Sequence, residues 1–339
     1  MIFFCLGINH KTTSLELREK AYLLRNEVVS FWKANIPEAR ILFTCNRIEI
    51  YGEADSEVLL LNVVKSFEAK FSVFQNSYLR LSEPAFLHAL SLASGLDSQI
   101  IGEKEVIKQL KFWIEDKDFP HDLKVIWEDI LSLARKIRVE SGLDKVGQNI
   151  AQIVLRDIAR IGSGLETCKI AIIGTGKVAE IFAQENSPRF KFYFFSKKNY
   201  KRANQLAGNC GGKAFLLEDL DYALNSIEVL ISATKASHYI LKREKLEEML
   251  KKRKQPFHIY DLSIPRSIEP STEDAKGVIL KNLENLKHLF AKHNQELIFY
   301  RKKAEQLANE LLEFNSGEND GLSDKGRDTF KPACFGSSR

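Results

Sequence analysis

Two residues in the segment 40–53 could do chemistry together, Cys45 and Arg47. β-Prone runs at 41–43 and 48–51 flank a polar break of Thr44, Cys45, Asn46 and Arg47, which predicts a hairpin with the thiol at its tip. A guanidinium two residues from a cysteine favours the nucleophilic thiolate and also offers a planar fork to a carboxylate. A cysteine at a strand end can equally be an inert, small apolar residue. The local sequence therefore leaves a catalytic and a structural role open.

A second group of polar side chains interrupts the mostly helical region 83–117. The break at 94–98 contains Gly95, and Gly102 follows it. Either a ligand site or an ordinary capped helix junction explains this density of hydrogen-bonding groups, which are Asp97, Ser98, Gln99, Glu103, Lys104, Glu105 and Gln109. His88, on the preceding helix, is likewise either functional or a satisfied core histidine.

A third segment has the pattern of a dinucleotide-binding turn. An apolar strand at 169–173 leads into Gly174, Thr175, Gly176, Lys177, Val178 and Ala179, and a helix follows. A strand, a glycine turn and a helix N-terminus with free amides suit a pyrophosphate.

The next strand, 190–195, ends in Ser196, Lys197 and Lys198, where an NAD site would have an acidic residue. Cations at this position suit the 2′-phosphate of NADP. A solvated run of charge would have the same sequence, so that interpretation stays open.

The surrounding elements divide the chain into domains. Residues 2–8 predict a strand and residues 14–34 and 57–71 predict helices, which with the hairpin give a small α+β unit. Helices at 123–141 and 149–161 lead to a Gly-Ser-Gly hinge at 162–164, where we place a domain boundary. Strands at 169–173, 190–195, 228–233 and 258–262 alternate with helices and predict a doubly wound parallel sheet.

The C-terminal part has a different pattern. From Leu286 to Phe314, mostly apolar residues recur at alternating spacings of 4 and 3. This heptad seam predicts helix-to-helix association, either in a homodimer or against the chain's own domains. Residues 315–339 are rich in Gly, Ser, Asp and Lys, which predicts a disordered tail containing Cys334.

Composition limits the class of protein. A length of 339 residues favours two or three domains, and 44% hydrophobic with 28% charged residues is typical of a soluble globular protein. The net charge of +5 permits a polyanionic partner without requiring one. Five scattered cysteines argue against disulfides and zinc. The absence of paired ligand spacing also predicts no metal site. Because the opening residues lack a basic leader and no long apolar run is present, we expect a cytoplasmic protein without a membrane contact.

A thiolate in one domain and an NADP module in another suggest one reaction. The cysteine would attack an activated acyl group to form a thioester, and hydride from the nicotinamide would reduce the thioester to an aldehyde. Two other classes remain open. One is a non-catalytic NADP-binding module that uses the Cys45 loop structurally, and the other is an aldehyde dehydrogenase that oxidises a free substrate.

Several motifs resemble those of the glutamyl-tRNA reductase family. They are Gly-Ile-Asn-His-Lys-Thr-Thr at 7–13, Thr-Cys-Asn-Arg-Ile-Glu-Ile-Tyr at 44–51, Ala-Ser-Gly-Leu-Asp-Ser at 93–98 with Ile-Gly-Glu at 101–103, Ile-Gly-Thr-Gly-Lys-Val at 173–178 and Asp-Leu-Ser-Ile-Pro-Arg at 261–266. The resemblance covers residues 1–314 in the family's order.

The resemblance implies a multi-domain α/β and α+β protein. Its parts are an N-terminal α+β catalytic domain at 1–150, a Rossmann-type NADPH domain at 151–275, a helical dimerisation domain at 276–314 and the tail at 315–339. It further implies NADPH-dependent reduction of glutamyl-tRNA(Glu) to glutamate-1-semialdehyde through a Cys45 thioester, the first step of porphyrin synthesis from glutamate. The implied partners are charged tRNA(Glu), a second copy of the chain and an aminotransferase that takes the product, with no DNA.

The resemblance also assigns roles to residues. Cys45 matches the nucleophile, His88 a histidine important for activity, and Arg47 the partner of the glutamate carboxylate. The implied substrate contacts are Thr44, Asn46, Arg47, Ser98, Glu103, Lys104, Glu105 and Gln109, and the turn 174–179 matches the nucleotide site. Glu105 and Lys108 depart from the family's usual Gln and Gly, as do residues 148–151 from a small Ser-rich run and residues 281–282 from an acidic segment. We therefore expect an active enzyme with altered interdomain contacts.

Overall fold

The computed structural model of the protein describes residues 1–161, 166–185, 187–251, 253 and 255–317. Its first sheet contains four antiparallel strands in the order β2-β3-β1-β4. The strands are β1 (Ile2–Asn9), β2 (Arg40–Phe43), β3 (Arg47–Ala54) and β4 (Tyr78–Leu81). Sequence pattern predicts the first three and misses β4, because its short run has no fully buried residue to mark a core face.

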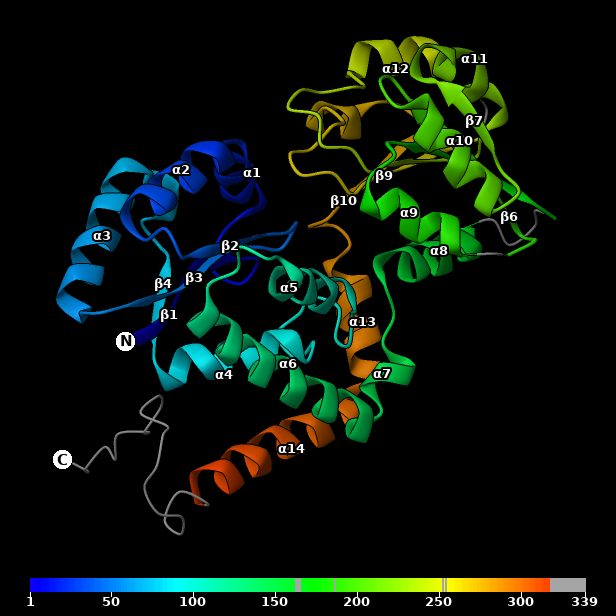
Figure 1. Cartoon of the computed structure of the whole chain (residues 1–339). Coiled ribbons are helices and arrows are strands. Elements are labelled where there is room, and N and C mark those ends of the chain that lie inside the picture. The colour runs from blue at the N-terminus through cyan, green and yellow to red at the C-terminus, as the bar shows by residue number, and fades with distance from the viewer. Residues whose placement is uncertain (162–165, 186, 252, 254, 318–339) are drawn as a thin grey trace.

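Helices cover both faces of this sheet (Figure 1). Phe4, Leu6 and Ile8 pack against one set of helices, while Phe3 and Cys5, on alternate positions of the same strand, pack against the other. The expected helix 14–34 is two helices that meet at Leu24. The helices of this domain are α1 (Leu15–Leu23), α2 (Arg25–Asn35), α3 (Glu57–Lys70), α4 (Glu83–Ala93), α5 (Glu105–Glu115), α6 (His121–Ser141) and α7 (Leu143–Val146), with a 3₁₀ turn η1 (Ser72–Phe74).

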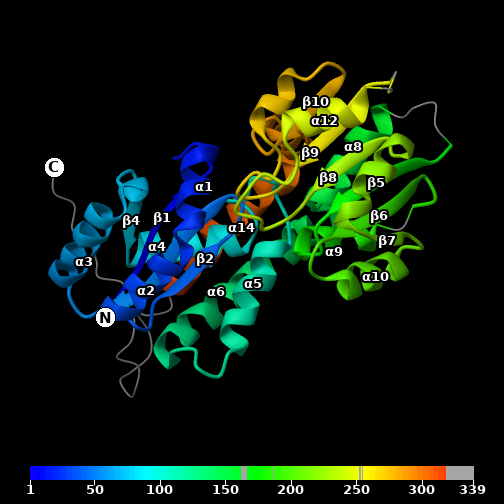
Figure 2. The ribbon, with the colours of Figure 1, turned by 90° about the horizontal axis from the view of Figure 1, so that it is seen from above.

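The second sheet is parallel and has six strands in the order β10-β9-β8-β5-β6-β7. Figure 2 shows the two sheets at opposite ends of the molecule. The strands are β5 (Cys168–Ile173), β6 (Phe190–Ser196), β7 (Lys213–Leu216), β8 (Val229–Ser232), β9 (Phe257–Asp261) and β10 (Val278–Asn282). Its helices are α8 (Ile150–Ile161), α9 (Lys177–Gln184), α10 (Tyr200–Asn209), α11 (Leu220–Ala223) and α12 (Arg243–Leu250), with 3₁₀ turns η2 (Leu217–Asp219), η3 (Leu224–Ser226) and η4 (Pro270–Asp274). The expected doubly wound sheet is therefore confirmed.

The structure moves one predicted boundary. The sequence places residues 276–314 in a helical domain, but β10 pairs in parallel with β9 and completes the second sheet. Lys281, on β10, also forms an ion pair of 2.6 Å with Asp157 of α8. The nucleotide-domain unit thus extends at least to Asn282, because β10 needs the sheet to satisfy its backbone hydrogen bonds.

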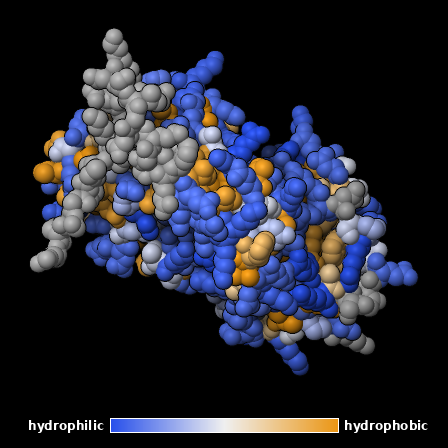
Figure 3. Space-filling view, turned by 90° about the horizontal axis from the view of Figure 1, so that it is seen from below, coloured by the Kyte–Doolittle hydropathy of each residue, from blue (hydrophilic) through white to orange (hydrophobic). Residues whose placement is uncertain are grey.

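The heptad segment forms two helices, α13 (Lys287–Glu296) and α14 (Ile298–Gly317), which meet at Leu297. Leu286 and Phe290 pack on the second sheet's core, whereas Tyr300 and Ala304 pack on the core around α6. Much of the seam therefore contacts the chain's own domains, the alternative that the pattern left open. On the underside of the molecule, apolar side chains lie in small groups separated by hydrophilic ones (Figure 3), and α14 leaves Ile298 and Phe299 exposed. Residues 315–317 of the expected tail belong to α14, and 318–339 lie outside the described residues.

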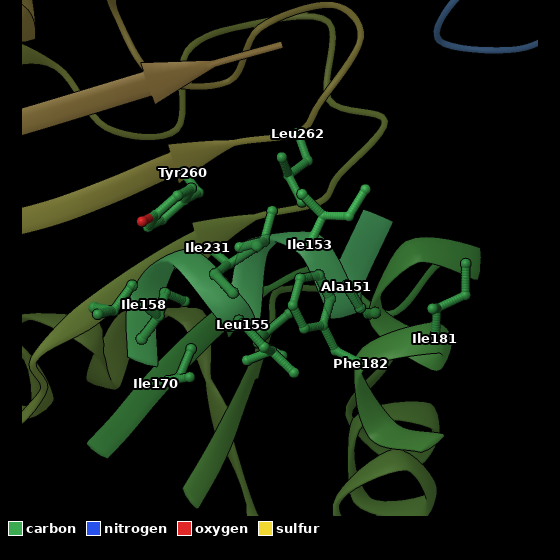
Figure 4. Packing of buried hydrophobic residues seen from close by; sticks show 14 of the residues in the cluster. Ala151, Ile153, Leu155, Ile158, Ile170, Ile181, Phe182, Ile231, Tyr260 and Leu262 are labelled. Carbon is green, nitrogen blue, oxygen red and sulfur yellow. The ribbon is translucent and has the colours of Figure 1, made fainter. Parts of the chain in front are cut away.

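Packing in the second domain explains why its strands are continuous apolar runs in the sequence. Ile170 and Ile172 of β5 face a cluster formed with α8, α9 and α10, while Ala171 and Ile173 face the α12 side. Figure 4 shows α8 beside the sheet, where its Ile153, Leu155 and Ile158 belong to one buried cluster with strand residues such as Ile231. A sheet covered on both faces holds its strand ends rigidly, which suits a site built at those ends. Among the described helices, none combines the length and apolar character needed to cross a bilayer.

Candidate active site

The turn that carries Cys45 is fixed by hydrogen bonds on both sides. Thr44 Oγ1 accepts from the backbone N–H groups of Asn46 and Arg47, both at 3.1 Å. From the neighbouring loop, the backbone N–H of His10 donates to the Asn46 carbonyl at 2.8 Å. Small polar residues thus turn the chain as the sequence predicts, and Cys45 lies half-buried at the tip.

Behind the tip, Arg47 is buried in a network of charges and is only 1% exposed. Its Nη1 donates to Glu49 Oε1 at 2.7 Å and to Asp97 Oδ2 at 3.1 Å, and its Nη2 donates to the Asp97 carbonyl. Asp97 also pairs with Lys11. The sequence-based expectation of a guanidinium fork open to a carboxylate is not what the structure shows, because both terminal nitrogens already have protein partners.

Glu49 is the centre of this network and is fully buried. Besides Arg47, it accepts from His88 Nε2 at 2.9 Å, from the Tyr51 hydroxyl at 2.8 Å and from the Tyr78 hydroxyl. Despite burial, the Arg47 guanidinium and the bonds from His88 hold the pKa of Glu49 far below its usual range. His88 therefore lies within the network that supports the hairpin.

Sequence reasoning misses Glu49 and Tyr78, although a signal for Glu49 exists. Arg47, Glu49 and Tyr51 alternate along β3, whereas Ile48 and Ile50 between them pack on the opposite face. When both faces of a strand are buried, polar residues at every second position indicate a buried polar network. Tyr78 has no comparable signal, since β4 is itself inconspicuous in the sequence.

One group in the described chain has metal-ligand geometry. Atoms of Cys5, Glu49 and His88 lie within 4.8 Å of one another. The Glu49 oxygens already accept hydrogen bonds from four protein donors. These carboxylate oxygens are therefore already engaged by the protein.

The Cys45 thiol differs from the sequence-based expectation of a thiolate. Burial, and then the negative charge of Glu103, raise the pKa of Cys45 to about 12, against the opposing effect of Arg18 and Arg47. Desolvation thus affects the pKa of Cys45 more than the nearby Arg47 cation does. A thiol with this pKa is protonated at neutral pH, so a nucleophilic role for Cys45 would require a proton acceptor.

Glu103 is suited to that task. Burial raises the pKa of Glu103 from its usual 4.5 to about 7, against the opposing effects of Ser98, Arg47 and Arg138. A carboxyl group that titrates near neutrality can take up a proton at the pH of a cell. It stands on the break between α4 and α5, which the sequence identified as dense in polar groups.

This break is held by two side chains that sequence reasoning does not single out. Arg138 of α6, 3% exposed, donates to the carbonyls of Ser94, Gly102 and Glu103 at 3.0, 2.8 and 3.1 Å. Asn294 of α13 accepts from the Ile101 N–H at 2.9 Å and donates to the Gln99 carbonyl at 3.0 Å. The loop's backbone is thus fixed at both ends.

Three buried polar atoms near the hairpin have no hydrogen-bond partner among the described residues. They are Asn46 Oδ1, His10 Nδ1 and Ser98 Oγ. Burial lowers the pKa of His10 to about 4, so its ring is neutral. Unpaired buried polar atoms cost free energy, which a bound polar substrate would recover.

The other predicted substrate contacts on the break and on α5 are engaged with protein partners or exposed. Lys104 pairs with Asp144 at 3.2 Å, and Glu105 pairs with Lys108 at 2.8 Å. Gln109 is exposed on α5. The two departures from the family pattern, Glu105 and Lys108, thus neutralise each other and add no net charge.

At the second sheet, the glycine turn lies between β5 and α9. Gly174 has φ +114°, and a Cβ there would lie 2.3 Å from the carbonyl oxygen of Ala233, the residue that follows β8. Only glycine therefore fits at this position. Around Gly176 a Cβ would meet no atom within 4 Å. The first glycine makes the turn, and the second leaves open space at the start of α9, where Thr175, Lys177, Val178 and Ala179 complete the turn.

The end of β6 presents cations beside this turn. Ser196 is buried and its Oγ accepts from the Asn199 N–H at 3.0 Å, which shapes the strand end. Lys197 and Lys198 are exposed. Arg202, in contrast, pairs with Glu180 at 3.3 Å. The open glycine and the two lysines fit a phosphorylated dinucleotide at this edge of the sheet.

Comparisons with known proteins agree with both halves of the chain. Residues 6–141 match the family described as "Glutamyl-tRNAGlu reductase, N-terminal domain", and residues 157–289 match "Shikimate / quinate 5-dehydrogenase". The chain is 29% identical to a glutamyl-tRNA reductase of Sulfurihydrogenibium sp. over 330 residues, covering 92% of this chain and 75% of that protein. A glutamyl-tRNA reductase of Aquifex aeolicus is 27% identical, with 89% and 78% covered.

Among solved structures, the "Glutamyl-tRNA Reductase from Methanopyrus kandleri" is similar with a TM-score of 0.42 and 23% identity, covering 94% of this chain and 81% of that one. The sequence matches extend across the hairpin, the polar break and the nucleotide turn in one order. Residues 6–141 thus match the N-terminal domain family of glutamyl-tRNA reductases, and about nine-tenths of the chain is similar to glutamyl-tRNA reductases.

Proposed function

We propose that the protein reduces glutamyl-tRNA(Glu) to glutamate-1-semialdehyde with NADPH and releases the tRNA. The similarity to glutamyl-tRNA reductases supports this function, and the observation that carries it is the position of Cys45. The thiol lies at a hairpin tip and packs against the apolar cluster of the nucleotide domain. A thioester formed there would lie beside the domain that holds the reductant.

In the first half of the reaction, the Cys45 sulfur attacks the ester carbonyl that links glutamate to the tRNA. The carbon–sulfur bond forms, the ester carbon–oxygen bond breaks, and the tRNA hydroxyl leaves with a proton. We assign Glu103 as the acceptor of the thiol proton, because its charge is the one that most affects Cys45 and its pKa is about 7. The unpartnered atoms of Asn46, His10 and Ser98 supply hydrogen bonds for the glutamyl group.

For the second half, residues 174–179 would hold the pyrophosphate of NADPH, and Lys197 and Lys198 its 2′-phosphate. The dinucleotide, when bound, supplies hydride. The protein's own task is to keep the thioester carbonyl away from water and near the carboxyl edge of the sheet. As the aldehyde leaves, the Cys45 sulfur regains its proton.

The partners are part of the proposal. The charged tRNA(Glu) is the substrate, a second copy of the chain would associate through the C-terminal helix, and an aminotransferase would take the aldehyde. Ile298 and Phe299, exposed on α14, support a contact between copies.

Steady-state assays separate this function from its rivals. We expect aldehyde from glutamyl-tRNA plus NADPH, and none after RNase treatment or with free glutamate. An aldehyde dehydrogenase acting on a free substrate would be indifferent to RNase. A protein that binds NADPH but gives no aldehyde would be a binding module.

Replacing Glu103 tests its role in the acyl step. For the wild type, the rate of thioester formation should rise with pH through about 7 as Glu103 loses its proton. Glu103→Gln should slow the step by on the order of 10²-fold and remove this limb of the profile. Because its folded pKa is raised, the stability that Glu103 contributes is present below pH 4.5 and lost as pH rises through 7. An unchanged pH–rate profile in Glu103→Gln would exclude this residue as the acceptor.

Replacing Lys197 and Lys198 together by Ala should weaken NADPH binding about tenfold to hundredfold, because two charge-assisted contacts to a phosphate are lost. NADH, which lacks that phosphate, should bind with unchanged affinity. Titration calorimetry measures both constants. Lys191→Ala, an exposed lysine elsewhere on β6, is the matched control and should change neither. Equal losses for NADPH and NADH would contradict the assignment.

A further inference from the structure

The catalytic and nucleotide domains are joined by an ion pair that the reaction described above does not use. Arg266 follows β9 at the carboxyl edge of the second sheet, and Glu19 belongs to α1 of the first domain. The Arg266 backbone N–H donates to Glu19 Oε1 at 2.6 Å, and Nε and Nη2 donate to the carboxylate at 2.9 and 2.8 Å. The side chains are 15% and 12% exposed, so water screens the pair only weakly.

The neighbouring residue of α1 makes a second contact to the same domain. Arg18, 2% exposed, donates to the Thr13 carbonyl at 2.7 Å and to Glu284 Oε1 at 3.2 Å. Glu284 follows β10, so one turn of α1 touches two separate segments of the nucleotide domain. Between the domains, Leu15 and Cys45 share an apolar cluster with Ile264. The thiol therefore lies at the interface that these ion pairs span.

The loop that carries Arg266 is itself rigid. The Asp261 carboxylate, 1% exposed, accepts from the backbone N–H groups of Ser263, Ser267 and Ile268 at 3.1, 2.8 and 2.9 Å. Arg266 is thus a fixed point on the edge of the sheet where a dinucleotide would bind. Holding α1 to that point fixes the distance between the domain that carries Cys45 and the sheet edge of the nucleotide domain.

We propose that the Arg266–Glu19 pair holds the two domains together around the Cys45 thioester and so decides between its reduction and its hydrolysis. This inference rests on the proposed function. In reduction, hydride and a proton convert the thioester to aldehyde and thiol. In hydrolysis, a water oxygen adds to the carbonyl, the carbon–sulfur bond breaks, and glutamate and thiol are released. Loosening the interface admits water and separates the thioester from the reductant, so hydrolysis gains.

The test is a single turnover of labelled glutamyl-tRNA at saturating NADPH, with aldehyde and free glutamate measured separately. Glu19→Gln and Arg266→Glu should lower the ratio of aldehyde to glutamate about tenfold. Label attachment without NADPH, and the NADPH dissociation constant, should change less than twofold. Arg266 is a positioning residue, so its effect should appear in the partition of the intermediate and not in its formation.

Two further variants sharpen the result. Glu16→Gln removes only a single 3.3 Å contact of Arg266 from a half-exposed side chain and should leave the ratio nearly unchanged. The charge-reversed pair Glu19→Arg with Arg266→Glu should restore most of the ratio, which a merely misfolded protein could not do. If the single variants partition as the wild type, or if the double variant is no better than either single variant, the inference is wrong. If the wild type forms neither labelled protein nor aldehyde, the proposed function itself fails.

Discussion

Cys45→Ala should abolish both activities of the protein, aldehyde formation with NADPH and slow hydrolysis of the glutamyl ester without it. Both pass through the same thioester in this account, and no other described cysteine lies at the hairpin. We expect a loss of on the order of 10³-fold or more in single-turnover rate. NADPH affinity should stay within twofold, because the nucleotide turn belongs to the other domain.

Cys210→Ser is the matched control. Cys210 is a partly buried cysteine at the end of α10, remote in sequence from the hairpin, and its replacement should leave turnover unchanged. Retention of ester hydrolysis by Cys45→Ala at the wild-type rate would show that another group attacks the ester.

Glu49→Ala should be the most destabilising single change near the site. It leaves the Arg47 cation buried with only Asp97 to compensate it, and it removes the acceptor for His88, Tyr51 and Tyr78. Removing one partner of a buried ion pair costs about 3–5 kcal/mol. The free energy of unfolding from urea titration should fall by that amount, and turnover should fall with it because the hairpin loses its support.

Glu53→Ala, on the same strand but partly exposed, should cost less than about 1 kcal/mol. The pH dependence gives an independent check. Because the pKa of Glu49 is lowered, its contribution to stability is present above the usual pKa of 4.5 and is lost only as pH falls below it. Equal stability of the two variants at pH 7 would mean that the Glu49 network contributes little.

Sequence patterns predict the features of the fold that neighbouring residues determine. The small polar residues at 44–47 force a turn, and Gly174 is required where β5 passes the Ala233 carbonyl. These signals lie within a few residues of the feature they specify. The short strands β4 and β7 were missed, because four-residue runs that are only partly buried carry no clear period.

The charge state and surroundings of the site could not be predicted from neighbours in sequence. The proximity of Arg47 suggested a thiolate, but burial and Glu103 dominate the pKa of Cys45. Arg47 itself is enclosed by Asp97, fifty residues away. Arg138 and Asn294 hold the polar break from distant helices, and Arg266 meets Glu19 across 247 residues. Such contacts depend on how domains pack, and a single sequence contains no local record of that packing.

The most direct test of the central claim is an acid-quenched single turnover with glutamyl-tRNA labelled in the glutamyl group, without and then with NADPH. We predict label bound covalently to the wild-type protein, absent in Cys45→Ser, and released as an aldehyde only when NADPH is present. A protein that acquires no label and forms no aldehyde, while still binding NADPH, would contradict the account and show that the Cys45 hairpin is structural.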